Sequence, residues 1–165
     1  MSLTLRMMGV ILIVVLSAAC VFAQDKIADL RSRFVREPDP IHKAISLVPL
    51  GDAEFLEIQK EFEAGELPEA LAVLRQYRDE ARSCKDSLDA MGIDAERHPA
   101  GFKQLQISLR ESLRRLDGLL VSIPRDQQEP FLEVRKEIDQ INRHLIRELF
   151  PRQPDTETEP AKKKG

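Results

Sequence analysis

Histidine, cysteine and serine are the side chains of this sequence that could carry catalysis or hold a metal ion. The three histidines, His42, His98 and His144, share no short spacing, and neither an HExxH nor a CxxC motif occurs. A metal site would therefore have to be assembled wholly by the fold, because no local segment supplies two ligands. We interpret the histidines as surface residues, and we predict no catalytic residue, metal ligand or cofactor site.

Cys84 is the one cysteine within the predicted helices. It repeats every seven residues with Tyr77 and Met91, so it belongs to the apolar face of a helix. No histidine lies near it in the sequence to activate the thiol, and we predict a buried small hydrophobe rather than a nucleophile. The serines occur without a G-x-S-x-G motif, and the sequence has no glycine-rich phosphate loop.

The first 24 residues have the three parts of a secretory signal peptide. Arg6 supplies the positive charge, residues 7–19 are apolar, and Val21-Phe22-Ala23 has the small or β-branched residues that precede a cleavage site. We predict cleavage after Ala23 and an exported protein, either periplasmic or secreted. The alternative is an uncleaved membrane anchor, because residues 7–23 are just long and apolar enough to span a bilayer.

Residues 16–20, Leu16-Ser17-Ala18-Ala19-Cys20, resemble a bacterial lipoprotein box, which implies a further alternative, lipid attachment at Cys20. Membrane contact is thus expected only if the segment stays uncleaved or Cys20 is lipidated. Cleavage after Ala23 leaves Cys84 as the single thiol of the mature chain. An intramolecular disulfide is then impossible, so Cys84 either pairs with another chain or is buried.

The composition is typical of solvated helices around an aliphatic core. Charged residues make up 32% of the chain and aromatic residues 5%, and the formal net charge of −3 gives no reason to expect nucleic-acid binding. Apolar residues recur at spacings of three and four, and no alternating strand of useful length is found. We predict an all-α fold, an up-down antiparallel helical bundle. Its three long helices lie at about residues 67–91, 101–123 and 127–150, with shorter helices before them.

Prolines, glycines and capping residues set the expected ends of the other helices. Residues 25–36 form a short helix, and Pro49-Leu50-Gly51 is expected to break the chain before a new helix that Asp52 caps. The spacing of Asp126 and Glu129 predicts a capping box for the last helix.

Three segments make up the predicted domain organisation. Residues 1–23 are the signal peptide, residues 24–150 are the helical bundle domain, and residues 151–165 are a tail. The tail contains three prolines and almost no apolar side chain, so it cannot bury enough surface to fold, and we predict that it is disordered.

Two short segments resemble known families. Residues 65–71, GELPEAL, resemble the turn between the helices of a tetratricopeptide repeat, with Gly65 and Ala70 at the usual separation. No second copy follows at a period of about 34 residues, so we interpret the segment as a single helix-turn-helix. Residues 123–127, IPRDQ, are similar to the Leu-Thr-x-x-Gln signature of small periplasmic helical chaperones of the envelope-stress type. This resemblance implies a chaperone-like role.

One charge pattern indicates a contact surface. Residues 24–98 carry 11 basic and 17 acidic groups, whereas residues 99–150 carry 9 and 8. In the second part, four residues align along one helix face outside its apolar stripe, and we call them the docking strip: Lys103, Ile107, Arg110 and Arg114. The strip could dock an acidic protein or an anionic lipid surface. Alternatively, it pairs with the acidic first half or is simply solvated.

These observations favour an exported, non-enzymatic helical protein that acts through contacts with an unknown protein partner, as an adaptor, scaffold or chaperone-like binder. The alternative is an enzyme or a metal-binding protein with a site assembled across helices. An enzyme should have a concave pocket with converging titratable groups. A binding module should instead have an exposed groove or apolar patch.

Export gives the first test. Because Val21-Phe22-Ala23 ends the apolar run, the intact mass of the mature protein should correspond to a chain that begins at Gln24. Recovery from membranes of a chain that begins at Met1 would support an anchor instead. A lipid adduct on Cys20 would support the lipoprotein.

Overall fold

The structure, a computed structural model, describes residues 26–151, and every regular element in that range is helical. The predicted all-α bundle is confirmed. The predicted signal peptide, Cys20 and residues 152–165 of the predicted tail lie outside the described residues. The elements are α1 (residues 26–36), α2 (Pro40–Ala64), α3 (Leu67–Asp89), α4 (Phe102–Leu120), the short 3-10 helix η1 (Arg125–Gln127) and α5 (Glu129–Leu149).

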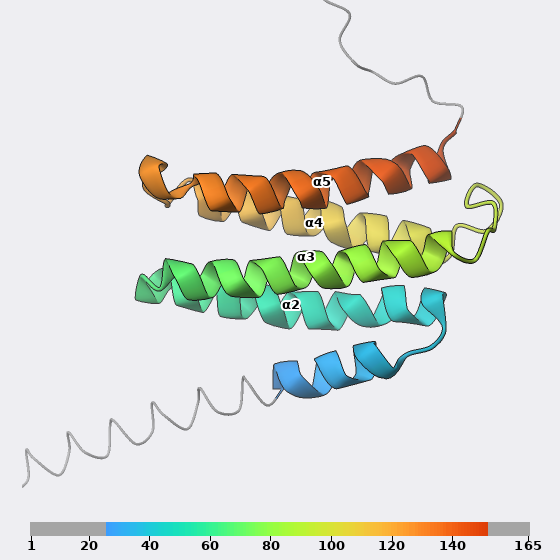
Figure 1. Cartoon of the computed structure of the whole chain (residues 1–165), viewed down its shortest axis with the longest axis horizontal. Coiled ribbons are helices and arrows are strands. Elements are labelled where there is room, and N and C mark those ends of the chain that lie inside the picture. Colours follow the sequence, from blue (N-terminus) through green and yellow to red (C-terminus); the bar gives the residue numbers. More distant parts are fainter. Residues whose placement is uncertain (1–25, 152–165) are drawn as a thin grey trace, which may run out of the picture.

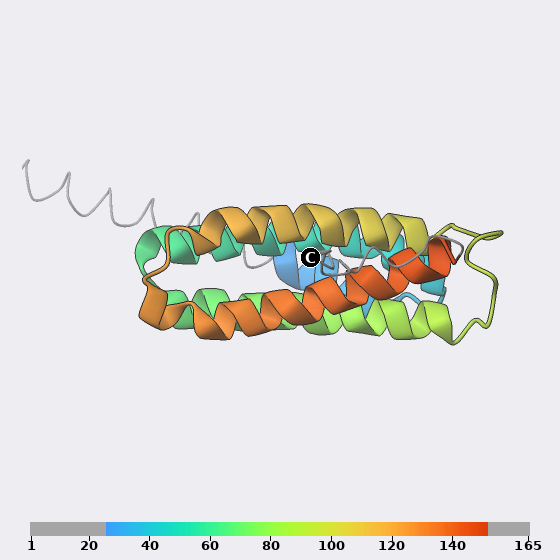
Figure 2. The ribbon, with the colours of Figure 1, turned by 90° about the horizontal axis from the view of Figure 1, so that it is seen from above.

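The helices are stacked in three layers. The α4 and α5 helices form one layer, the α2 and α3 helices form the second, and α1 lies along the outer face of the second layer (Figure 1). Seen from above, α4 overlies α2 and α5 overlies α3, with α1 beneath them (Figure 2). Helices α2 to α5 alternate in direction (Figure 1). The short turns between α2 and α3 and between α4 and α5 require this reversal, whereas residues 90–101 form a longer loop between α3 and α4.

The core is aliphatic, and the predicted stripes of α3, α4 and α5 build most of it. Burial of each of the larger aliphatic side chains contributes about 1.5–3 kcal/mol to the free energy of unfolding. The fully or almost fully buried members are Ala70, Leu74, Tyr77, Ala81, Cys84 and Leu88 from α3, Phe102, Leu105, Leu109 and Leu116 from α4, and Phe131, Val134, Ile138 and Leu145 from α5.

The predicted break at Pro49-Leu50-Gly51 is wrong, because α2 runs through Pro49 without interruption. The bundle therefore has four long helices where the sequence predicted three. The helix begins earlier than expected, where Asp39 Oδ1 accepts a hydrogen bond of 2.8 Å from the backbone N–H of His42. Leu47 and Leu50 are fully buried on either side of the proline. Their burial offsets the roughly 3 kcal/mol that a proline costs inside a helix.

Gly51 lets α2 approach α3 at the ring of Tyr77. A Cβ atom on Gly51 would lie 2.8 Å from Cε2 of Tyr77. The Tyr77 ring is held in place, because it packs edge-on against Phe55 with centroids 5.2 Å apart. Its hydroxyl also shares a hydrogen bond of 2.7 Å with Ser112 Oγ of α4. Three helices thus meet at this ring.

The predicted capping box of Asp126 and Glu129 is also wrong. Helix α5 begins after Gln128 and has no side-chain hydrogen bond at its N-cap. The Gln128 side chain instead turns back to the end of α4, where its Nε2 donates to the carbonyl oxygens of Leu120 (3.1 Å) and Ile123 (2.8 Å). In this turn the Gln128 side chain therefore satisfies backbone carbonyls at and just after the end of α4, rather than backbone amides at the start of α5.

Replacing Gly51 with alanine should lower the free energy of unfolding by about 1–3 kcal/mol, the usual cost of overpacking a filled core. The matched control is Gly118→Ala in α4, where an added Cβ would have no atom within 4 Å. That change should raise stability by about 0.5–1 kcal/mol through helix propensity alone. Urea denaturation followed by circular dichroism measures both variants. Equal effects would contradict the steric role of Gly51.

Candidate functional site

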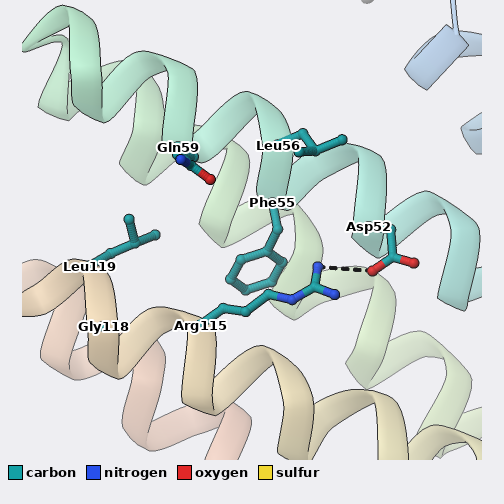
Figure 3. A pocket seen from close by; sticks show the side chains of 7 residues that line it. All are labelled: Asp52, Phe55, Leu56, Gln59, Arg115, Gly118 and Leu119. Carbon is teal, nitrogen blue, oxygen red and sulfur yellow. Dashed lines mark ion pairs between the residues drawn. The ribbon is translucent and has the colours of Figure 1, made fainter.

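An open groove lies between α2 and α4 on the side of the bundle. One part of it has a volume of about 580 Å³. Its walls come from one face of each helix, because residues three and four apart lie side by side on a helix. The lining residues are Asp52, Phe55, Leu56 and Gln59 from α2, and Arg115, Gly118 and Leu119 from α4 (Figure 3).

A second hollow continues the groove towards the start of α4. Its volume is about 190 Å³, and it shares Asp52 and Arg115 with the first part. Between them these two side chains form an ion pair, Nη1 to Oδ1 at 2.8 Å, which Figure 3 shows as a dashed line. We call the two parts together the α2–α4 groove. The ion pair forms a bridge across it.

The bridge is held weakly. Both side chains are substantially exposed, and an exposed ion pair typically contributes about 0.2–1 kcal/mol. The Arg115 guanidinium also lies over the Phe55 ring, 5.8 Å from its centroid, which adds a modest attraction. A ligand carboxylate can therefore replace Asp52 on Arg115 at little cost.

The groove exposes apolar surface that the fold itself does not use. The Leu56 side chain is 66% exposed although it lies beside the buried Phe55. On the opposite wall, Gly118 has no side chain and Leu119 is half-buried. Single exposed leucines are ordinary, but this one lines a concave surface.

The structure places the whole docking strip on the exposed side of α4. Ile107 lines the second hollow, so the strip meets the α2–α4 groove at this residue, whereas Lys103, Arg110 and Arg114 are not among the lining residues. Arg114 has only a long contact of 3.7 Å to Glu111. Within residues 26–151, Lys103 and Arg110 form no ion pair. The residue of α4 that reaches the acidic α2 helix is Arg115, which is not part of the strip.

A second cluster of charges lies between α1, α2 and α3, where two carboxyl groups are buried, and sequence reasoning missed it. Arg31 of α1 donates from Nη2 to Oε1 of Glu54 in α2 and from Nε to Oε1 of Glu80 in α3, the latter at 2.9 Å. Glu54 is 0% exposed and Glu80 is 5% exposed. The remaining oxygen of each carboxyl, Oε2, has no hydrogen-bond partner. We call these three residues the carboxyl cluster.

One guanidinium cannot neutralise two carboxylates, so the cluster favours a retained proton. Burial, and then the charge of Glu80, raise the pKa of Glu54 to about 8, although Arg31 acts in the opposite direction. The neutral state of the cluster therefore has one proton, one carboxylate and one guanidinium. Both carboxyl groups are buried in this arrangement, whereas the Arg31 side chain is 35% exposed.

A sequence signal for the carboxyl cluster exists. Glu54 lies four residues after Leu50 and four before Ile58, both fully buried, so it occupies the apolar stripe of α2. Glu80 likewise lies between Tyr77 and Cys84 on the stripe of α3. A charged residue on each of two facing apolar stripes indicates a buried pair. The predicted break in α2 concealed the first of them.

The histidines do not come together. His42 and His98 are exposed, and His144 Nε2 lies 3.1 Å from the Asp89 carboxylate. Among the described residues, no three histidine, cysteine or acidic side chains are grouped so that they could hold a metal ion. No helix in the same range has the length and hydropathy to cross a membrane.

The predicted burial of Cys84 is confirmed, since its side chain is 0% exposed. Burial raises the pKa of its thiol to about 12, which leaves almost no thiolate at neutral pH. The native protein should therefore react slowly with a thiol reagent at Cys84, and quickly once it is denatured. Cys84→Ser should cost about 1–3 kcal/mol by placing a hydroxyl in an apolar seam. Mass mapping of labelled peptides measures the first effect, and rapid native labelling would refute the packing role.

Comparison with known proteins gives no relative for this arrangement. No family model matches the chain. Searches of the curated proteins and of the solved structures also found no match. The function of the chain is therefore inferred from its own geometry.

Proposed function

We propose that this is an exported, non-enzymatic helical protein that binds an acidic, amphipathic segment of a partner protein in the α2–α4 groove. The observation that supports the proposal is a junction of two surfaces. Ile107 belongs both to the apolar groove and to the docking strip, whose Lys103 and Arg110 lack an ion pair within the described residues. The groove would take apolar side chains, and the strip would take carboxylates.

The shape of the groove fits a helix of the partner. It follows the axes of α2 and α4 from Val48 past Asp52 to Gln59. An amphipathic helix laid along it would place apolar side chains at three- and four-residue spacings against Leu56 and Ile107. Each large apolar side chain buried in this way contributes about 1.5–3 kcal/mol.

Charge complementarity argues for an acidic segment. Lys103 and Arg110 are seven residues apart on one face of α4, or about 10.5 Å along the helix axis. Carboxylates seven residues apart on a partner helix would meet both cations. Such exposed pairs steer association and set register, and they weaken as salt is added. Arg115 offers a third cation once Asp52 is displaced.

A protein partner is favoured over a lipid surface by the shape of this side. The apolar residues lie in a concave groove, whereas a membrane surface needs a convex apolar face flanked by cations.

A binding role is favoured over an enzymatic one by where the titratable groups lie. The groups with unusual environments, Glu54 and Glu80, are enclosed. The charged side chains that line the open groove are Asp52, Glu111 and Arg115, and both carboxylates pair with Arg115 at the surface. The export part of the proposal is supported by the sequence of residues 1–23.

Site-specific photo-crosslinking tests the proposal. A benzoylphenylalanine at Leu56 should crosslink to one polypeptide in a cell-envelope fraction, and the same residue at Leu132 of α5, also exposed, should not. Mass spectrometry should map the adduct to an acidic amphipathic segment. Adding salt and the double change Arg110→Glu with Arg114→Glu should both abolish it, because each removes the attraction.

The double variant also serves as its own control for folding. Exposed charge reversals usually change stability by no more than about 0.5 kcal/mol, so the thermal midpoint should hardly move. Unfolding of this variant would mean that the strip pairs internally. Adducts at Leu56 and Leu132 alike, or binding of the unmodified protein to phosphatidylglycerol vesicles without any peptide adduct, would also overturn the proposal.

A further inference from the structure

Helix α1 is attached to the rest of the bundle by a short apolar face and by one charged side chain. Ile27 and Leu30 are partly buried and pack against the core. Residues 37–39 connect it to α2, and the carboxyl cluster anchors it through Arg31. Phe34 is its one buried aromatic residue, and the Lys43 ammonium lies 5.1 Å from the centre of that ring. An isolated helix as short as residues 26–36 is marginal in water, so these contacts keep α1 ordered.

The anchor contains an electrostatic conflict. The charged groups that face Glu54 are Arg31 from α1 and Glu80 from α3. The Gln76 side chain donates a hydrogen bond of 2.9 Å to Oε1 of Glu80. If Glu54 also ionises, two buried carboxylates share one guanidinium and the cluster carries a net negative charge. Such a charge is costly away from water.

The other titratable groups around the cluster do not compensate for this charge. Tyr77 and Cys84 lie beside it on α3, and burial raises the pKa of each to about 12, so both stay neutral at moderate pH. Lys43 of α2 brings an ammonium group towards Cys84 and the Phe34 ring. The carboxyl pair is therefore the part of this region whose charge changes near neutrality.

We propose that α1 is a pH-gated strap, which stays docked on α2 and α3 while the Glu54–Glu80 pair holds one proton and is released when that proton leaves. Release would expose the inner face of α1 and the faces of α2 and α3 beneath it. This device acts on the outer face of the second layer, so it is independent of partner binding in the α2–α4 groove.

The direction of the pH dependence follows from proton linkage. The docked state raises the pKa of Glu54 to about 8. Release opens Glu54 to water, which moves its pKa towards the value of about 4.3 of an exposed carboxyl, although Glu80 still faces it and Arg31 no longer lowers it. The pKa of the released state therefore lies between these two numbers. The docked state binds one proton more than the released state between the pKa values of Glu54 in the two states. Docking is strongest below the lower of these pKa values. Between the pKa of Glu54 in the released state and its pKa in the docked state, the equilibrium constant for release should rise by up to about tenfold per pH unit. Above the pKa of the docked state it should level off.

Hydrogen exchange on the full chain tests the proposal. The rates in peptides from residues 26–36 are corrected for intrinsic exchange and compared, between pH 5 and pH 9, with those from α5. The protection of α1 should fall with pH by up to about tenfold per unit and then level off, while α5 stays protected. Glu54→Gln, which mimics the protonated carboxyl, should keep α1 protected throughout.

Glu57→Gln is the matched control, because Glu57 is another buried glutamate of α2 but pairs with Lys60 rather than Arg31. It should keep the wild-type profile. The proposal is overturned if α1 and α5 lose protection together, or if Glu54→Gln retains the wild-type slope. Should Glu54→Gln fail to fold, the wild-type comparison of α1 with α5 still decides, since a flat profile for α1 contradicts the strap.

Discussion

Helix α2 continues without interruption through Pro49, and both the α2–α4 groove and the carboxyl cluster depend on this continuity. A helix that stopped at Pro49 and restarted at Asp52 would change direction between Leu47 and Phe55. The continuous helix instead turns one face to α4 and another to α1 and α3. Asp52, Leu56 and Gln59 line the groove on the first face, and Glu54 is buried on the second. The burial of Leu47 and Leu50 holds this geometry together.

The two faces of α2 hold ion pairs in opposite environments, one exposed to water and one buried. The Asp52–Arg115 pair lies in water, where solvent screens the charges and either partner can exchange at low cost. The Glu54 and Glu80 carboxyl groups that share Arg31 lie away from water, where an excess of one negative charge is costly and a retained proton removes it. An exposed pair suits a surface that must open to a ligand. Two buried carboxyl groups that share one guanidinium suit a contact that responds to pH.

Much of the fold was predictable, because its long helices have regular apolar stripes. The stripes on α3, α4 and α5 placed Cys84, Leu109 and Ile138 in the core, and the structure confirms all three. The break at Pro49 was mispredicted because local propensity argued for it, whereas the packing of Gly51 against Tyr77 is a tertiary contact. The capping box failed for a similar reason, since Gln128 serves the end of α4, eight residues before it.

The candidate sites were harder to predict than the fold. The docking strip was visible as a line of exposed side chains on one helix, but the groove beside it exists only because α2 and α4 meet. The carboxyl cluster joins Arg31 to Glu80, 49 residues apart, and each residue taken alone looks like a solvated surface charge. Their positions on apolar stripes marked Glu54 and Glu80 as unusual, and the stripe of Glu54 crosses the predicted break.

The ring of Tyr77 has a spectroscopic consequence. The sequence contains one tyrosine and no tryptophan. The near-ultraviolet absorption of the chain therefore comes chiefly from a single phenol, the one that α2, α3 and α4 enclose. Because burial raises the pKa of Tyr77 to about 12, a red-shifted phenolate band that develops well below this pH indicates that the junction has opened. The protein thus contains its own chromophore at its centre, and an unmodified sample reports the integrity of the three-helix junction without an added label.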